Sequence, residues 1–205
     1  VDLDQDEFVC IFARDNAYLQ DIVSHMDWSY HDSRDCDIDG LIVSTQYLIE
    51  KGFKVIRVGS KVNKAINFSH KNLIDYPFSG LQSEFMDVFL LANCRFVLES
   101  GASGLTNLAD IFDRPVARIN TVEFGIIPIG KNCLYIPKKF KYQNTKDYLH
   151  FNDALKLKEN FWYDLSKVGL EAEDNSPQDM LEATQEMLAR FENNFRYSPE
   201  QEKLV

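Results

Sequence analysis

The amino-acid sequence predicts an α/β fold, a Rossmann-like doubly wound parallel sheet over residues 8–120. Short apolar runs at residues 8–13, 53–59 and 116–119 alternate with segments of helical spacing. A turn of small residues at 99–104 separates the strand-like run 95–98 from the helical run 105–112. Strand, turn, helix and strand form a βαβ unit, which implies parallel strands joined by a right-handed crossover.

The first predicted strand is residues 8–13, six apolar residues typical of a strand buried on both faces. It ends directly before Arg14 and Asp15. Ligands of doubly wound sheets bind where the strands end, so Arg14 is a candidate cation for a diphosphate. The alternative is a surface ion pair between Arg14 and Asp15.

A polar loop at residues 29–40 follows, rich in aspartate. His31 and Asp32 are candidates for a catalytic base and the group that orients it. Adjacent side chains rarely face each other, however, and a solvated loop is the alternative. The ligand spacing matches no known metal site, so we expect no bound metal.

Two helices and two strands are predicted next. A helix at 41–51 ends at Gly52. The second strand, at 53–59, carries Arg57 near its carboxyl end, which is a second candidate cation for the ligand, and Gly59 lies just beyond Arg57. A third strand at 72–75 precedes a helix over 83–94. The spacing predicts that this helix buries Phe85, Val88, Phe89 and Ala92.

The turn at 99–104 suits an anion. Gly101 and Gly104 lack a Cβ, so their backbone N–H groups can approach a ligand closely and adopt positive φ. Ser100 and Ser103 supply hydroxyl groups, and the following helix directs its free N–H groups to the same place. The alternative is a connection that only lets helix and strand pack closely.

We expect one domain spanning residues 1–205. Its parts are an α/β core at 8–120, a loop-rich extension at 121–175 and a C-terminal helix at 176–196 that docks on the core. Lysines at 138, 139, 141 and 146 form a basic cluster in the extension, which we interpret as a solvated loop.

Composition narrows the function classes. A net charge of −10 and a pI of about 4.9 argue against a nucleic-acid partner. No apolar run reaches the roughly 20 residues of a membrane span, and no signal peptide is recognisable. The four cysteines form no CxxC motif, so reduced thiols and a cytoplasmic place are expected. A peripheral position at the inner membrane is compatible with the absence of a membrane-spanning run and with reduced cysteines.

Several segments together resemble a bacterial family of glycosyltransferases found with capsule and lipopolysaccharide (surface carbohydrate) biosynthesis. The resemblance covers roughly residues 8–194. Its segments are Phe-Ala-Arg-Asp-Asn-Ala-Tyr-Leu at 12–19, Tyr-His-Asp-Ser-Arg-Asp-Cys-Asp-Ile at 30–38, Lys-Val-Ile-Arg-Val-Gly at 54–59, Ser-Glu-Phe-Met-Asp-Val-Phe-Leu at 83–90, Ser-Gly-Ala-Ser-Gly at 100–104, Arg-Ile-Asn at 118–120 and Glu-Asp-Asn-Ser-Pro-Gln-Asp-Met at 173–180.

The resemblance implies the donor-binding half of a GT-B-type glycosyltransferase, a metal-independent enzyme without a cofactor. Its partners would be a nucleotide-sugar donor and a glycan or lipid-linked glycan acceptor. The donor-binding residues it implies are Arg14, Arg34, Arg57, Gly59, Glu99, Ser100, Gly101, Ala102, Ser103 and Gly104. Two departures matter: Asp35 stands where the family pattern has Asn, and 205 residues correspond to one half of such an enzyme.

The mechanism expected from this resemblance is transfer of a sugar from a nucleotide-diphosphate sugar. Arg14 and Arg57 would neutralise the leaving diphosphate, and Asp32 or His31 would deprotonate the acceptor hydroxyl. Two other classes remain open. A nucleotide-sugar epimerase would convert the donor without an acceptor, and a non-catalytic binding or assembly module would show an exposed apolar face and no nucleotide affinity.

Overall fold

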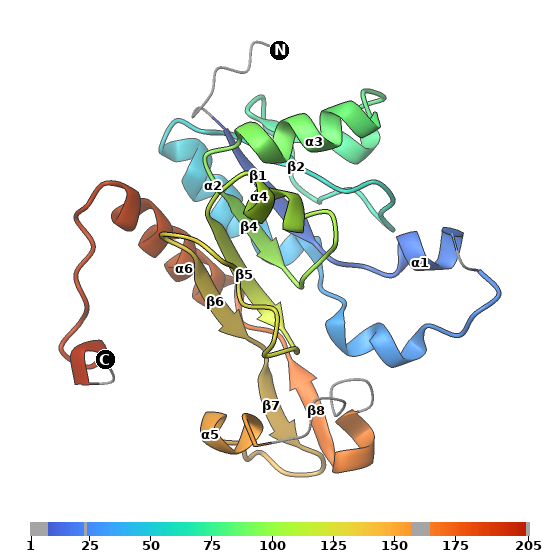
Figure 1. The fold of residues 1–205 in the computed structure, drawn as a ribbon, viewed down its shortest axis with the longest axis vertical. Coiled ribbons are helices and arrows are strands. Elements are labelled where there is room, and N and C mark those ends of the chain that lie inside the picture. Colours follow the sequence, from blue (N-terminus) through green and yellow to red (C-terminus); the bar gives the residue numbers. More distant parts are fainter. Residues whose placement is uncertain (1–7, 23, 157–164, 204–205) are drawn as a thin grey trace.

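The computed structural model describes residues 8–22, 24–156 and 165–203. Its centre is a six-stranded, all-parallel sheet in the order β3-β2-β1-β4-β5-β6 (Figure 1). The strands are β1 (Phe8–Ala13), β2 (Lys54–Arg57), β3 (Leu73–Asp75), β4 (Val97–Ser100), β5 (Val116–Thr121) and β6 (Leu134–Pro137). The predicted Rossmann-like α/β class is therefore confirmed.

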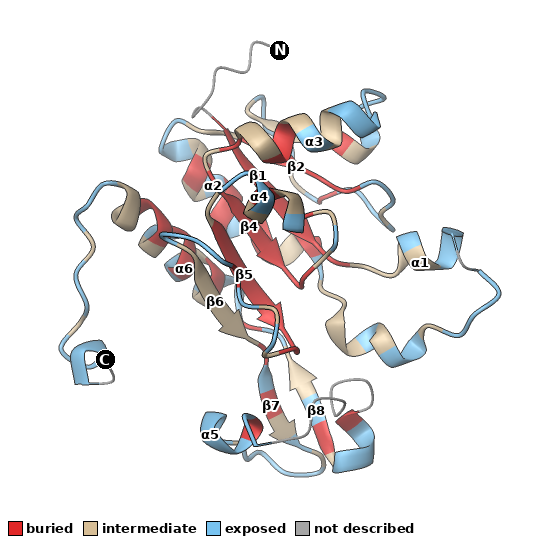
Figure 2. Cartoon of the chain, viewed as in Figure 1, coloured by how far each residue is buried: buried red, intermediate tan, exposed pale blue. Residues whose placement is uncertain are grey.

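Helices cover both faces of this sheet because the central strands are apolar on both sides. In β1, Val9 and Ile11 join a core with α2 (Ile42–Glu50) and α6 (Pro177–Phe191). Phe8 and Cys10 point the other way, into a core with α3 (Glu84–Asn93) and α4 (Asn107–Ile111). Figure 2 shows the central strands buried throughout. This continuous burial explains why β1 reads as an unbroken apolar run.

The strand order reverses between β1 and β4. From β1 the chain passes through α2 to β2 and β3, then crosses the opposite face through α3 to reach β4. The connections that leave β1 and β4 therefore diverge onto opposite faces. Such a switch point opens a crevice at the carboxyl ends of the two strands, where ligands of doubly wound folds bind.

Two predicted elements differ from the observed ones around this crevice. The strand predicted to end at Leu98 continues to Ser100, paired with Ala13 on one side and Ile119 on the other. The helix predicted over 105–112 spans only Asn107–Ile111. Glu99 and Ser100 therefore belong to the sheet and not to the turn.

The predicted buried face of α3 was wrong for two of its four residues. Phe85 is 72% exposed and Val88 is 39% exposed, whereas Phe89 and Ala92 are half-buried. Phe89 packs against the core together with Met86, and the fully buried residues of the helix are Leu90 and Leu91. The face of α3 on the core is therefore rotated from the predicted one. Ser83 caps this helix, because its hydroxyl accepts from the Met86 N–H.

Residues 121–175 contain more regular structure than predicted. Residues 134–137 form the sixth strand of the main sheet, and β7 (Lys139–Tyr142) pairs antiparallel with β8 (Leu170–Glu173). These two strands and α5 (Phe151–Ala154) surround a small separate core of Val122, Phe140, Ala154, Leu165 and Leu170.

Six further helical elements of the described residues are short. They are α1 (Ala17–Ile22), η1 (Ser29–Arg34), η2 (Ile38–Leu41), η3 (Tyr76–Phe78), η5 (Leu165–Val168) and η6 (Gln201–Lys203). The final long helix, α6, begins with a capping box between Ser176 and Asp179. Its Met180 and Met187 pack in the same core as α2. Just before the helix, the Asn175 N–H donates to Asn120 Oδ1 at 2.7 Å, near the end of β5, which places the N-terminus of α6 at the carboxyl edge of the sheet.

Candidate functional site

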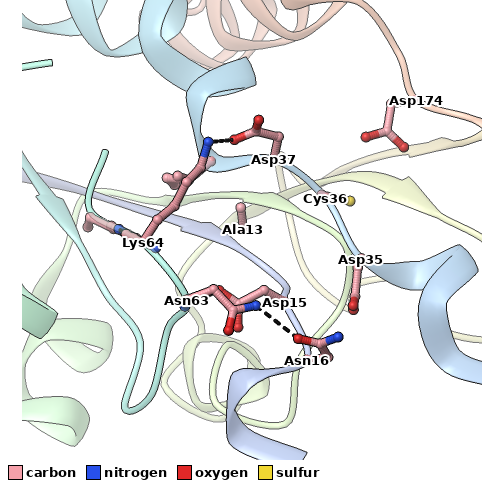
Figure 3. A pocket seen from close by; sticks show the side chains of 11 residues that line it. Ala13, Asp15, Asn16, Asp35, Cys36, Asp37, Asn63, Lys64 and Asp174 are labelled. Atoms are coloured by element: carbon pink, nitrogen blue, oxygen red, sulfur yellow. Dashed lines mark hydrogen bonds and ion pairs between the residues drawn. The ribbon is translucent and has the colours of Figure 1, made fainter. Parts of the chain in front are cut away.

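Two pockets lie at the carboxyl edge of the sheet, one on each side of the segment that leaves β1. We call the larger, of about 520 Å³, the arginine pocket: Arg14, Arg34, His31, Lys61 and the turn 102–104 line it, with Asp15 and Asp87. The smaller, of about 420 Å³, is the aspartate pocket. Asp35, Asp37 and Asp174 line it, together with Asn16, Asn63, Lys64, Cys36 and Arg57 (Figure 3). Ala13 and Asp15 border both.

Arg14 is the first residue after β1, and the sheet fixes its backbone. Its N–H donates to the Ser100 carbonyl at 2.9 Å, and its own carbonyl accepts from the Cys36 N–H at 2.9 Å. Only 7% of the residue is exposed. Its guanidinium forms an ion pair with the Asp35 carboxylate, and not with Asp15, which instead accepts from the backbone of Ala17 and Asn63.

The Asp35 carboxyl group, 23% exposed, lines the aspartate pocket and pairs with Arg14, which lines the arginine pocket. Burial raises its pKa to about 6, although the Arg14 guanidinium acts to lower it. The charge of this carboxyl group therefore changes just below neutral pH, directly beside the Arg14 guanidinium.

Segment 29–36 brings His31 and Arg34 to the arginine pocket. The Arg34 Nη1 lies 3.0 Å from His31 Nδ1, and its Nε lies 2.6 Å from a carboxylate oxygen of Glu123. Burial, with the nearby arginine charges, lowers the pKa of His31 to about 4. The imidazole is therefore neutral at pH 7, with Nδ1 facing an N–H donor and the proton on Nε2.

Asp32, the other candidate base, is exposed and lines neither pocket. Its carbonyl accepts from the Asp35 N–H at 3.0 Å. The catalytic roles of His31 and Asp32 stay predictions. The geometry separates them, because only His31 reaches the arginine pocket.

The glycine turn divides into two halves with different surroundings. Ala102, Ser103 and Gly104 line the arginine pocket. Glu99, Ser100 and Gly101 do not, because their polar groups are used inside the fold. The Gly101 N–H donates to the Ile119 carbonyl at 2.7 Å, and the Ser100 hydroxyl accepts from Asn120 at 2.9 Å.

Glu99 lies in a buried polar network on the α4 side of the sheet. It is 0% exposed and pairs with Arg118, whose Nη1 donates to the Ile126 carbonyl at 2.9 Å and whose Nη2 lies 3.1 Å from Asn107 Oδ1. Burial raises the pKa of Glu99. This network joins β4, β5 and α4, so the structure gives Glu99 a place in the fold and not at the ligand edge.

Gly101 is required by packing. Its φ is +78°, and an added Cβ would lie 2.8 Å from the Arg34 carbonyl oxygen and 3.0 Å from the Arg14 Cβ. The glycine therefore lets segment 34–36 approach β1 and β4 closely. Gly104 has nothing within 4 Å of a Cβ position. The first N–H groups of α4 are partly used as well, since the Leu108 N–H donates to the Leu105 carbonyl at 3.1 Å and the Ala109 N–H to the Thr106 carbonyl at 3.0 Å.

Arg57 and Gly59 lie apart from the turn. Arg57 lines the aspartate pocket, is 1% exposed and donates through Nη1 to the Lys64 carbonyl at 2.6 Å. Asp75 lies 3.3 Å from the same nitrogen. The Gly59 carbonyl accepts from the Gln82 amide at 2.8 Å, and Gly59 lines neither pocket. Arg14 and Arg57, predicted to act together, thus occupy different pockets.

Several charged residues of the site were not predicted from the sequence. Lys61 lines the arginine pocket, and Glu123 fixes Arg34. Lys138, predicted to be a solvated lysine, is 5% exposed and bonds to Asp174 and to the Asp35 carbonyl. A lysine directly after the apolar run 134–137, at the same sheet edge as Arg14, was the available signal for Lys138.

Comparison with known proteins does not show which family this chain belongs to. No protein-family model matches this chain, and no curated protein matches its sequence. One solved structure aligns with 93% of this chain at a TM-score of 0.47 and 12% identity: the dodecameric iron-containing heptosyltransferase TibC in complex with ADP-D-β-D-heptose. The alignment covers 47% of that chain, so the present chain spans about half its length. A likeness at this level carries no conclusion about activity.

Among the described residues, no helix is long and apolar enough to cross a membrane. Within the same ranges, no cluster of three or more His, Cys, Asp or Glu side chains is arranged to hold a metal ion.

Proposed function

We propose that this chain binds a nucleotide-diphosphate sugar and forms the donor half of a GT-B-type glycosyltransferase that acts on a surface-carbohydrate acceptor. One observation carries the proposal: Arg14 and Arg34, 20 positions apart in the chain, meet beside the turn 102–104 in a pocket at the switch point of a Rossmann-like sheet. Doubly wound sheets place their nucleotide ligands in this crevice.

The arginine pocket suits the diphosphate. Arg14, Arg34 and Lys61 contribute three positive charges against Asp15 and Asp87. Ser103 uses its oxygen to accept a backbone bond, which leaves its hydroxyl proton to donate. Donors fixed before the reaction stabilise the negative charge that grows on the leaving diphosphate without reorganisation during transfer.

The aspartate pocket suits the sugar. Asp35 and Asp174 can accept from sugar hydroxyls, and Asn16 and Asn63 can both donate and accept. Asn63 Nδ2 already donates to Asn16 Oδ1 at 2.9 Å, and Lys64 to Asp37 at 2.7 Å, which holds the wall of the pocket in place (Figure 3). The net negative lining disfavours a phosphate there. Asp32 or His31 would serve as the acceptor base.

Isothermal titration calorimetry tests the proposal. UDP, GDP, ADP and CMP are titrated into the purified chain and into Arg14→Ala and Ser103→Ala, with Arg196→Ala as the control because Arg196 is exposed and lines neither pocket. We expect one nucleotide to bind, with about tenfold loss or more in Arg14→Ala. If none binds at millimolar concentration, the proposal is wrong for this chain.

A specific observation favours a second candidate, a non-catalytic docking module. Arg14 and Arg34 are each paired with a carboxylate of the same chain. Phe78, Leu81 and Phe85 are 55%, 62% and 72% exposed around the start of α3. A module of this kind would bind no nucleotide, so the same titration separates the two functions.

A further inference from the structure

Lys138 connects the C-terminal half of the chain to the arginine pocket without lining that pocket. It lies between β6 and β7, and its side chain is 4% exposed. Its Nζ donates to the Asp35 carbonyl at 2.9 Å and lies 2.6 Å from Asp174 Oδ1. Its backbone N–H donates to the Thr121 carbonyl at 2.9 Å. Lys138 is therefore held at both ends, by its backbone N–H and by its side-chain ammonium group.

The bond to Asp35 matters because Asp35 determines where the Arg14 guanidinium lies. Segment 34–36 is held to β1 on one side, through the Cys36 N–H and the Arg14 carbonyl. Lys138, between β6 and β7 and 103 residues later in the sequence than Asp35, holds it a second time through the Asp35 carbonyl. Between these two anchors, the Asp35 carboxylate points to Arg14 and pairs with it.

We propose that Lys138 is a positioning residue for the arginine pocket: by fixing segment 34–36 it sets the position of Asp35 and, through it, of Arg14. This inference rests on the proposed function for its effect on nucleotide binding. The bond that Lys138 makes to the Asp35 carbonyl is independent of that function.

The charge of Lys138 offers a readout that a purely structural lysine would not affect. The charged groups that act on Asp35 are Arg14, Asp15, Asp32 and Lys138, and both cations lower the pKa of its carboxyl group. Removing the Lys138 ammonium therefore raises the pKa of Asp35 above about 6. The two aspartates act in the opposite direction and are unchanged by the substitution.

The test compares Lys138→Met with Lys139→Met. Lys139 is the adjacent residue, 46% exposed, and pairs with Asp179 at 3.0 Å, so its loss removes the same charge and length from outside the site. Nucleotide affinity is measured by calorimetry at pH 8.5, well above the Asp35 pKa of about 6, so that the Asp35 carboxylate is charged in every variant and no release of Arg14 by protonation opposes the expected loss. The titration midpoint of Asp35 is measured by carboxyl ¹³C NMR of the free protein. We expect about tenfold weaker binding in Lys138→Met and a higher Asp35 midpoint, with neither change in Lys139→Met.

Lys138→Gln keeps an N–H donor and removes the charge, so it serves as the second variant where Lys138→Met does not fold. A folded variant of Lys138 with wild-type affinity and a wild-type Asp35 midpoint would overturn the proposal. Where the wild type binds no nucleotide, the donor-binding function fails. The Asp35 midpoint then still decides whether Lys138 acts on this carboxyl group.

Discussion

The guanidinium of Arg14 and the carboxylate of Asp35 form an ion pair at the boundary between the arginine and aspartate pockets. In the described structure, the best-placed cation of the site is thus partly neutralised by its own chain. A diphosphate must share Arg14 with Asp35 or displace it. The charge state of Asp35 therefore controls how strongly Arg14 can act on an anion.

Asp35→Asn should strengthen nucleotide binding. The amide keeps an oxygen that accepts from Arg14 but removes the competing negative charge. At pH 7.5 we expect about three- to tenfold tighter binding by calorimetry. Asp37→Asn is the matched control, because Asp37 lies in the aspartate pocket, 62% exposed, and pairs with Lys64. Equal or weaker binding in Asp35→Asn would contradict the role assigned to the ion pair.

Nucleotide-sugar affinity should rise as pH falls from 7.5 to 5. Asp35 becomes protonated through its pKa of about 6, and Arg14 is then released toward the ligand. A nucleotide sugar is the right probe, because its diphosphate has no terminal phosphate group that titrates in this window. The pKa of His31, lowered to about 4, keeps the imidazole neutral throughout. The dependence should disappear in Asp35→Asn, and an unchanged slope there would exclude Asp35 as its source.

Folding stability should respond to pH through two groups of opposite sign. The folded-state pKa of Asp35 is raised from 3.8 to about 6, so the folded protein holds the extra proton and Asp35 lowers stability as pH rises through this window. The folded-state pKa of His31 is lowered from 6.5 to about 4, so His31 raises stability as pH rises from about 4 to 6.5. The two contributions oppose each other in the wild type.

Urea denaturation at pH 4.5 and at pH 7 separates these contributions. Asp35→Asn removes the Asp35 contribution and keeps that of His31, so stability should rise more steeply with pH than in the wild type. His31→Gln removes the His31 contribution and keeps that of Asp35, so the pH dependence should shift in the opposite direction. Identical pH dependence in both variants would show that neither group has the pKa shift described here.

Arg118→Met should destabilise the fold strongly. It leaves the Glu99 carboxylate, which is 0% exposed, without its cation and removes the donor to the Ile126 carbonyl. We expect a loss of about 3–5 kcal/mol in the free energy of unfolding, measured by urea denaturation. The double variant Arg118→Met with Glu99→Leu should recover part of it, since no unpaired charge remains. A loss below about 1 kcal/mol would argue against a buried ion pair.

Gly101→Ala and Gly104→Ala should differ although both change the same turn. At Gly101 the φ of +78° and the contact of 2.8 Å with the Arg34 carbonyl oxygen oppose a Cβ. We expect a loss of about 2 kcal/mol or more in unfolding free energy. At Gly104 a Cβ meets open space, so stability should change by less than about 0.5 kcal/mol. Similar losses at both positions would contradict the packing role of Gly101.

Local sequence predicted the Rossmann-like class because strands buried on both faces leave continuous apolar runs, as in β1. It also predicted that Arg14 and the turn 99–104 lie at one edge, since parallel strands end together. Ser83 and Ser176, each at the start of a predicted helix, cap α3 and α6. The apolar runs and the caps depend on residues a few positions apart, and the shared edge follows from the parallel pairing of the strands.

Only the tertiary structure decided which polar groups of the site are already used. Whether Gly101 serves packing depends on the Arg34 carbonyl, and whether Lys138 is solvated depends on Asp35, 103 residues earlier. The exposed side of α3 likewise depends on how the helix is rotated against the core. Contacts between distant segments leave no periodicity in a single sequence, so the sequence determined the scaffold and the edge, and the folded chain determined the partners of each charge.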